Sequence, residues 1–146
     1  MSTKTTRLLV LTIAVMALSV PVLAHHGTAA LDNETKITLK GTVTEWLWSN
    51  PHCLLQFDVK GEDGKVVHWI GETQNPVSMV NVGWSKAAIK AGDEVTVVIL
   101  PVKNGLPLGR LASVLLPNGK TLISGEGLPR EEREKLEHDV RAARPE

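Results

Sequence analysis

The 146-residue sequence has one cysteine, no excess of either charge and no apolar run long enough for a comfortable membrane span. A single cysteine excludes an intramolecular disulfide framework and a zinc site built from several thiolates. We expect this residue, Cys53, to be a small buried hydrophobe. The 16 basic and 16 acidic residues balance, which removes the general attraction to phosphate backbones that a basic protein has. We therefore expect no nucleic-acid partner.

Several catalytic signatures are also missing. The sequence has no glycine-rich phosphate loop, no G-x-S-x-G elbow, no H-E-x-x-H and no C-x-x-C motif. Its length suits one domain, and its hydrophobic content of 42% is close to that of globular proteins. These features favour a small binding protein over an enzyme.

The N-terminus has the pattern of a secretory signal peptide. Lys4 and Arg7 precede an uncharged run over 8–20, Pro21 follows, and small residues precede a cleavage site after Ala24. The run is shorter than the ~20 apolar residues of a membrane span, and no later segment approaches that length. We expect cleavage after Ala24, a periplasmic or secreted product and no stable membrane span, the alternative being an uncleaved N-terminal anchor.

Composition divides the rest of the chain into an arm over 25–35, a domain over 36–125 and a charge-dense tail over 126–146. In the tail, Leu136 and Val140 stand one helical turn apart, but two apolar positions make a thin stripe. We expect a weakly docked terminal helix there, with a partner-docking helix as the less favoured interpretation.

The central domain alternates apolar and polar residues with the two-residue period of β-strands. Gly41 interrupts the first strand, where a bulge or a bend would help the sheet curl. Between the third and fourth strands, residues 77–90 lack the period and suit one or two short helical turns. This order predicts a mostly β protein, an OB-like barrel of five to six strands with a short helical connection after strand three. An open β-sandwich is the alternative. Strands are expected over 37–47, 55–59, 66–70, 94–100, 111–116 and 120–123.

Cleavage after Ala24 would place His25 and His26 at the mature N-terminus. The terminal amine, the two imidazoles and the amide nitrogen between them suit Cu(II), which prefers nitrogen donors in a roughly planar arrangement. The amine has an ordinary pKa of about 7.7–8.0, so a metal can displace its proton near neutral pH. In outline, the pattern resembles the N-terminal-histidine copper sites of exported copper carriers and lytic polysaccharide monooxygenases. A further histidine would have to be His52 or His68, and we choose His52.

A second group consists of Trp46, Trp48 and the run Asn50, Pro51 and His52. Strict alternation places both tryptophans on the solvent face, where they would need a ligand or a partner. Alternatively, a bulge at the glycine of this strand turns both rings into the core. Asn50 and Pro51 form a turn that would hold His52 at the mouth of the first hairpin.

A third group begins within the strand expected over 66–70 and contains His68, Trp69, Glu72, Asn75 and Trp84. If Trp69 points into the barrel, His68 and Glu72 lie on the opposite face, but nothing makes them converge on one substrate atom as an acid and a base must. Trp84 is expected to plug one end of the barrel. An enzyme using His68 and Glu72 is therefore the least favoured hypothesis.

The run from His25 to Leu122 resembles a family of small exported bacterial proteins catalogued only as a domain of unknown function. The resemblance implies periplasmic or secreted residence and brings no reaction and no functional residues. Gly27 departs from the pattern, in which a serine is expected, and the charged tail extends beyond it. The matching landmarks are His25-His26, Leu39 to Val43, Trp48 to His52, Asp63 to Lys65, Trp69, Glu72 to Pro76, Gly83-Trp84, Gly92 to Val97 and Leu116 to Lys120.

We therefore expect a small exported β-barrel that binds a ligand at the mouth of its first hairpin. In the first hypothesis the ligand is copper, held by His25, His26 and His52. In the second, a metal-free surface contacts an unidentified small ligand or a protein of the cell envelope. The expected binding surface consists of Trp48, Asn50, Pro51, His52, Glu72 and Asn75.

Overall fold

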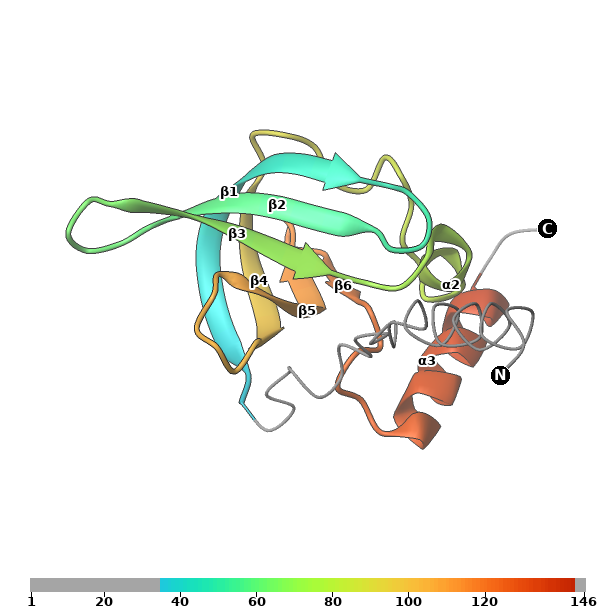
Figure 1. The fold of residues 1–146 in the computed structure, drawn as a ribbon. Coiled ribbons are helices and arrows are strands. Elements are labelled where there is room, and N and C mark those ends of the chain that lie inside the picture. The colour runs from blue at the N-terminus through green and yellow to red at the C-terminus, as the bar shows by residue number, and fades with distance from the viewer. Residues whose placement is uncertain (1–34, 144–146) are drawn as a thin grey trace, which may run out of the picture.

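A computed structural model of the chain describes residues 35–143. It contains six strands and two helices, and the short helix follows the third strand as expected (Figure 1). In chain order the elements are β1 (Ile37–Leu47), β2 (Leu54–Lys60), β3 (Val66–Glu72), α2 (Pro76–Asn81), β4 (Glu94–Pro101), β5 (Leu108–Leu115), β6 (Thr121–Ile123) and α3 (Arg130–Ala142).

The strands form one sheet in the order β3-β2-β1-β4-β5-β6. The sheet closes on itself because β3 also pairs with β5, in parallel, through Ile70–Glu72 and Leu108–Arg110. The closed part has five strands, and β6 is an extra strand added to β5. Closure removes sheet edges that would otherwise be exposed. The predicted OB-like barrel is confirmed, and the open sandwich is wrong.

Strand β1 takes part in both halves of the barrel. Its first half pairs with β4 and its second half with β2. The bulge in β1 lies between Val43 and Glu45, where the pairing register with β2 shifts, and the expectation of a bulge at Gly41 is wrong. Gly41 has a different function: a Cβ atom there would lie 2.5 Å from the backbone oxygen of Asp58. The glycine therefore permits a close approach of β1 and β2.

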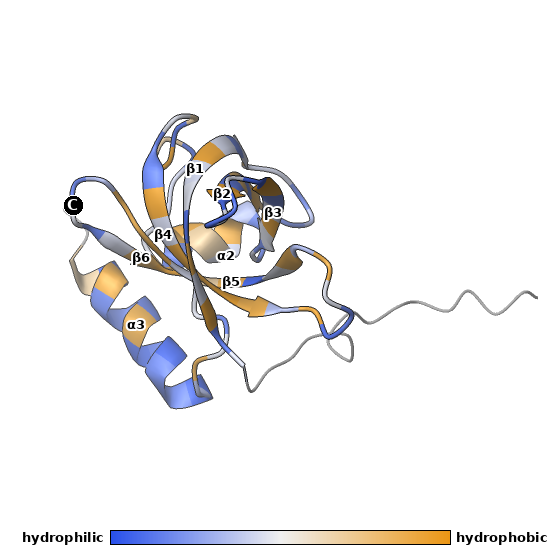
Figure 2. Cartoon of the chain, turned by 90° about the vertical axis from the view of Figure 1, so that its left-hand side faces the viewer, coloured by the Kyte–Doolittle hydropathy of each residue, from blue (hydrophilic) through white to orange (hydrophobic). Residues whose placement is uncertain are grey.

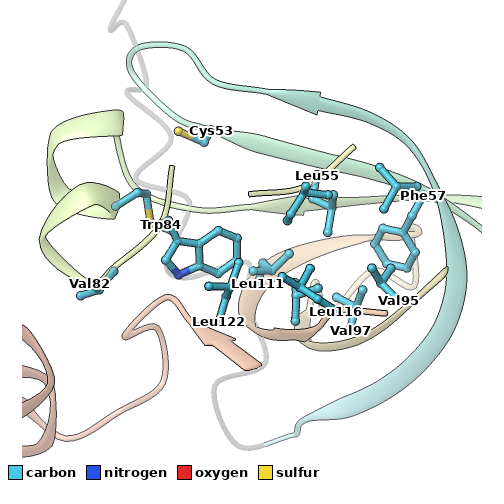
Figure 3. Close-up of a cluster of buried hydrophobic side chains, with 14 residues drawn as sticks. Cys53, Leu55, Phe57, Val82, Trp84, Val95, Val97, Leu111, Leu116 and Leu122 are labelled. Carbon is cyan, nitrogen blue, oxygen red and sulfur yellow. The ribbon is translucent and has the colours of Figure 1, made fainter. Parts of the chain in front are cut away.

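The barrel interior is filled by the inward-facing apolar side chains of the strands (Figure 3). Trp84 is only 2% exposed, packs at one end of this core and donates its indole N–H to the carbonyl of Ile123, at 2.9 Å. Cys53 is fully buried. Both residues thus lie where the sequence predicts. The buried core also includes Val43, Leu55, Phe57, Met79, Val95, Val97, Leu111, Val114, Leu116 and Leu122.

Helix α3 lies on the outside of the barrel and has no fully buried residue. Its polar face dominates, with apolar positions on one side only (Figure 2). Leu136 packs against the core as a half-buried side chain, and the γ-carbons of Val140 lie 3.5–3.6 Å from where a Cβ of Gly83 would be. Within residues 35–143, no helix combines the length and the apolar character that crossing a bilayer requires.

Candidate functional site

His52 lies in the loop between β1 and β2, and this loop is bound to the segment that follows β3. The backbone N–H of Cys53 donates to the carbonyl of Gln74 at 3.1 Å, and the N–H of Thr73 donates to the carbonyl of Cys53 at 2.9 Å. The Ser49 hydroxyl donates to the His52 carbonyl at 3.2 Å. The peptide bond between Asn50 and Pro51 is cis. The hydrogen bonds hold His52 in a defined place at one end of the barrel.

The His52 ring is oriented by two acceptors from the end of β3. Its Nδ1 lies 3.1 Å from Oε1 of Glu72 and 2.9 Å from the backbone oxygen of Thr73. Because both neighbours accept hydrogen bonds, Nδ1 carries the proton, and in the neutral ring Nε2 then has the lone pair. Nε2 has no hydrogen-bond partner in the part of the chain that the structure describes. The His52 side chain is 44% exposed, so the imidazole is accessible from solvent.

Cys53 faces the opposite way. Its side chain is buried, with Sγ 3.9 Å from the backbone oxygen of Ser49. Burial raises the pKa of the Cys53 thiol, more than its hydrogen bonds to Ser49 and Thr73 lower it. A protonated, buried thiol is neither a metal ligand nor a nucleophile. The site at this loop therefore depends on His52 and not on its neighbour.

A second polar cluster crosses the same end of the barrel, and sequence reasoning missed it. Arg110, which pairs with Glu72 across the barrel closure, forms a 3.2 Å ion pair with Glu126. The Gln74 amide donates to the same carboxylate at 3.3 Å. These side chains are far apart in the chain and have no local motif. They meet only because β3 pairs with β5 and the segment after β6 crosses the barrel end.

Some of the other expected binding residues pack against the core, and others are exposed to solvent. Trp48 and Trp46 are half-buried against the core with ring centroids 5.6 Å apart, and Trp46 lies equally close to Trp84. The alternative in which these rings turn inward is therefore the one observed. Asn50 and Pro51 are exposed beside His52.

Asn75 has a structural contact of its own. Its side-chain oxygen accepts the N–H of Ser78 at 3.1 Å and caps the start of α2. An N-cap of this kind satisfies a backbone donor that has no partner within the helix. The capping oxygen is therefore engaged before any ligand arrives.

His68 and Glu72 do not meet. His68 lies on the outer face of the β2–β3 hairpin, where its Nδ1 is 2.7 Å from Asp58 and its Nε2 is 3.1 Å from Gln56. Glu72 contacts His52 instead. The acid–base pair of the enzyme hypothesis is absent from residues 35–143. With both ring nitrogens engaged, His68 is also a poorer candidate than His52 for the additional copper ligand.

His25 and His26 lie outside the residues that the structure describes. Within residues 35–143, no three His, Cys, Asp or Glu side chains are grouped as a metal site. A metal bound to His52 would thus need further ligands from outside residues 35–143.

The ammonium group of Lys36, immediately before β1, donates to the carbonyl of Gly127 at 3.4 Å. Since Gly127 follows β6, this contact ties the start of β1 to the segment between β6 and α3.

Comparison with known proteins gives a family but no activity. A family of unknown function (DUF6152) matches residues 13–111. No curated protein and no solved structure matches the chain significantly. The matched range includes His25, His26, His52 and Glu72 and ends within β5, before Glu126 and α3.

Proposed function

Since the chain belongs to the family of unknown function DUF6152, we propose its function from the site alone: it is an exported protein that binds copper. The ligands are the N-terminal amine of His25, the imidazoles of His25 and His26, and Nε2 of His52. The observation that carries the proposal is the hydrogen bonding of His52 Nδ1, which leaves Nε2 available for a metal.

Metal-bound histidines almost always donate their other ring N–H to a carboxylate, a backbone carbonyl or water. His52 has the first two of these acceptors, Glu72 and the carbonyl of Thr73. Such partners select the tautomer and hold the ring in one orientation. The metal then meets a ligand that is already ordered, which reduces the entropy lost on binding.

The arm is long enough to bring its histidines to this end of the barrel. Two strands, β4 and β5, separate the start of β1 from the end of β3. Three strand-to-strand steps of about 4.8 Å correspond to roughly 15 Å around the barrel. The ten residues between His26 and Ile37 can span up to about 33 Å when extended. Chain length therefore permits the proposed ligand set.

Nitrogen donors of this kind suit Cu(II). Each donor must lose or lack a proton to bind, so protons compete with the metal and the affinity falls in acid. The export part of the proposal is supported by the signal-peptide pattern over residues 1–24. It is tested by the mass of the protein recovered from the cell envelope or medium, which should correspond to a chain that begins at His25.

The decisive measurement is a Cu(II) titration, followed by electron paramagnetic resonance, of the mature protein. We expect tight binding of one ion, lost when one extra residue precedes His25 and weakened at least tenfold in His52→Ala. Glu72→Ala should weaken binding by about 10- to 100-fold, because it removes a partner of a metal ligand. Asp58→Ala is the matched control, since Asp58 holds His68 at 2.7 Å in the same way, and it should bind like the parent.

Weak binding that is equal with and without the extra residue would contradict the copper proposal. The metal-free hypothesis would then take its place, with the exposed Asn50, Pro51 and His52 as the surface that contacts a small ligand or an envelope protein. Loss of binding in Asp58→Ala to the same extent as in Glu72→Ala would instead show a nonspecific effect of removing a carboxylate.

A further inference from the structure

Two polar contacts stand side by side where β3 pairs with β5. In the first, Nδ1 of His52 lies 3.1 Å from Oε1 of Glu72. In the second, Nη1 of Arg110 lies 3.2 Å from Oε2 of Glu126. Glu72 and Arg110 are register partners in the parallel pairing of the two strands. A cation thus stands next to the carboxylate that orients His52.

Glu72 and Arg110 also point to the same side of the sheet. A Cβ atom on Gly71, the residue before Glu72, would lie 2.8 Å from the side chain of Leu111, the residue after Arg110. Leu111 is fully buried, so these two neighbours face the barrel interior and alternation turns Glu72 and Arg110 outward. Adjacent strands lie about 4.8 Å apart. The Glu72 carboxylate is therefore within reach of the long Arg110 side chain.

Within residues 35–143, Arg110 nevertheless forms an ion pair with Glu126 and none with Glu72. Glu126 is the more enclosed carboxylate, since its side chain is 14% exposed and that of Glu72 is 33% exposed. Water screens an enclosed charge less, so the attraction to Arg110 is stronger there. The Gln74 amide also donates to Glu126 at 3.3 Å. Glu72 is consequently left to the His52 ring.

The position of Glu126 does not depend on its own carboxylate. Its backbone N–H donates to the Ser124 hydroxyl at 3.1 Å. The Ser124 side chain is buried, and its hydroxyl lies 3.1 Å from the carbonyl of Ala112 in β5, to which it donates. Glu126→Gln should therefore remove a negative charge beside Arg110 and leave the backbone in place.

We infer that Glu126 is a positioning residue for His52: it retains Arg110 and thereby keeps Glu72 free to accept the Nδ1 proton. Without the Glu126 charge, Arg110 turns to the Glu72 carboxylate beside it. A guanidinium forms stronger hydrogen bonds to a carboxylate than a neutral imidazole does, because both partners are charged. His52 then keeps only the Thr73 carbonyl as an acceptor. The inference deepens the proposed function and rests on it only for the consequence for copper.

The tautomer of His52, measured by imidazole ¹⁵N NMR of the metal-free protein, tests this inference. The spectra are recorded at about pH 8.5, where an ordinary imidazole is neutral. We expect Glu126→Gln to raise the fraction of rings with the proton on Nε2 at least twofold, as Glu72→Ala should. Arg110→Gln/Glu126→Gln also removes the competing cation and should restore the parent fraction.

The matched control is Glu134→Gln, which removes a carboxylate paired with an arginine on α3, Arg130, at 2.7 Å. It should leave the His52 tautomer unchanged. A parent-like His52 in Glu126→Gln would overturn the inference. A changed His52 that the double variant fails to restore would overturn it as well, because a disturbed backbone and not a freed Arg110 would then be the cause.

Copper affinity of the mature protein should follow the tautomer. We expect Glu126→Gln to weaken binding about tenfold, on the scale of losing a hydrogen-bond partner of a metal ligand, and the double variant to recover it. Because the NMR measurement uses metal-free protein, the two outcomes are separate. The expected tautomer changes in a protein that does not bind copper contradict the proposed function alone. Tight copper binding with a parent-like His52 in Glu126→Gln contradicts this inference alone.

Discussion

His52 and Cys53 are neighbours in the chain, yet their side chains lie in opposite environments. The His52 imidazole is 44% exposed and faces the Glu72 carboxylate, whereas Cys53 is fully enclosed. Alternation along an extended chain accounts for the opposite directions. Alternation does not account for the contact between His52 and Glu72, because Glu72 belongs to β3, which pairs with β2 in the barrel.

Cys53 alone should make the free energy of unfolding depend on pH in the alkaline range. Burial raises the thiol pKa above its usual value of 9.0, so the folded state binds a proton that the unfolded chain loses first. The stabilisation from the neutral thiol is fully present below the unfolded pKa and is lost as pH rises through the folded one. Urea unfolding from pH 7 to about 10.5 should therefore show a free energy of unfolding that falls above about pH 9.

The control for this prediction is Cys53→Ala, which lacks the titrating group and should show a smaller decline over the same pH range. A thiol reagent should also modify native Cys53 far more slowly than the unfolded protein, since only the thiolate reacts and the side chain is covered. Identical pH slopes in the two proteins, or equal reaction rates before and after unfolding, would contradict the expectation.

Among the elements, β1 shows how a glycine and a bulge can be confused in a sequence. Gly41 interrupts the alternation, but the register shift occurs at Thr44, an exposed residue between Val43 and Glu45. The bulge permits Trp46 and Trp48 to pack against the core, although strict alternation would place them in solvent. Bulges bend a strand and redirect its side chains in this manner.

Gly41→Ala and Thr44→Ala should consequently differ in stability. The added Cβ at position 41 would lie 2.5 Å from a backbone oxygen of Asp58 and 3.0 Å from the ring of Phe57. Since backbone cannot move away without separating β1 from β2, we expect a loss of about 1–3 kcal/mol in the free energy of unfolding. Thr44→Ala removes an exposed side chain and should cost less than about 0.5 kcal/mol. Equal losses in urea unfolding would show that the close approach at Gly41 is unimportant.

Across the molecule as a whole, the barrel and α3 contribute very differently to stability. The barrel closes through β3 and β5 and contains the buried core. Helix α3 has no buried residue and docks through the half-buried Leu136 and Val140. It also lies beyond residues 13–111, the range that the family matches. These facts describe a closed barrel with a peripheral helix.

Deletion of residues 130–146 should accordingly leave a folded barrel. We expect a loss of about 1–3 kcal/mol, which is the scale of burying one or two aliphatic side chains, measured by urea unfolding followed through tryptophan fluorescence. Leu136→Ala/Val140→Ala in the full chain should reproduce most of that loss. A deletion variant without a cooperative unfolding transition would show that α3 is part of the folding core.

Much of the fold can be predicted from the sequence because its signals are local. Alternation, β-branched residues and turn signals locate the six strands, the loss of alternation locates the helical connection, and the large apolar side chain of Trp84 within that connection predicts its place at the barrel end. The site is less predictable. The turn before His52 predicts that this residue lies at the mouth of the first hairpin. No local pattern reveals that the Asn75 side-chain oxygen caps α2 instead of facing a ligand. Gln74, Arg110 and Glu126 carry no signal, because each is unremarkable among its neighbours in the chain.

Neighbouring residues alone are enough to establish the strand pattern and the connection after strand three, since both follow from local polarity, whereas the burial of Cys53 is expected because it is the lone cysteine of the sequence. The assembled barrel adds what no local stretch contains: Glu72 orients His52, Arg110 pairs with Glu126, and Lys36 contacts Gly127. Those contacts join segments distant in the chain. They depend on the register in which β3 meets β5, and that register is established only when the whole core packs.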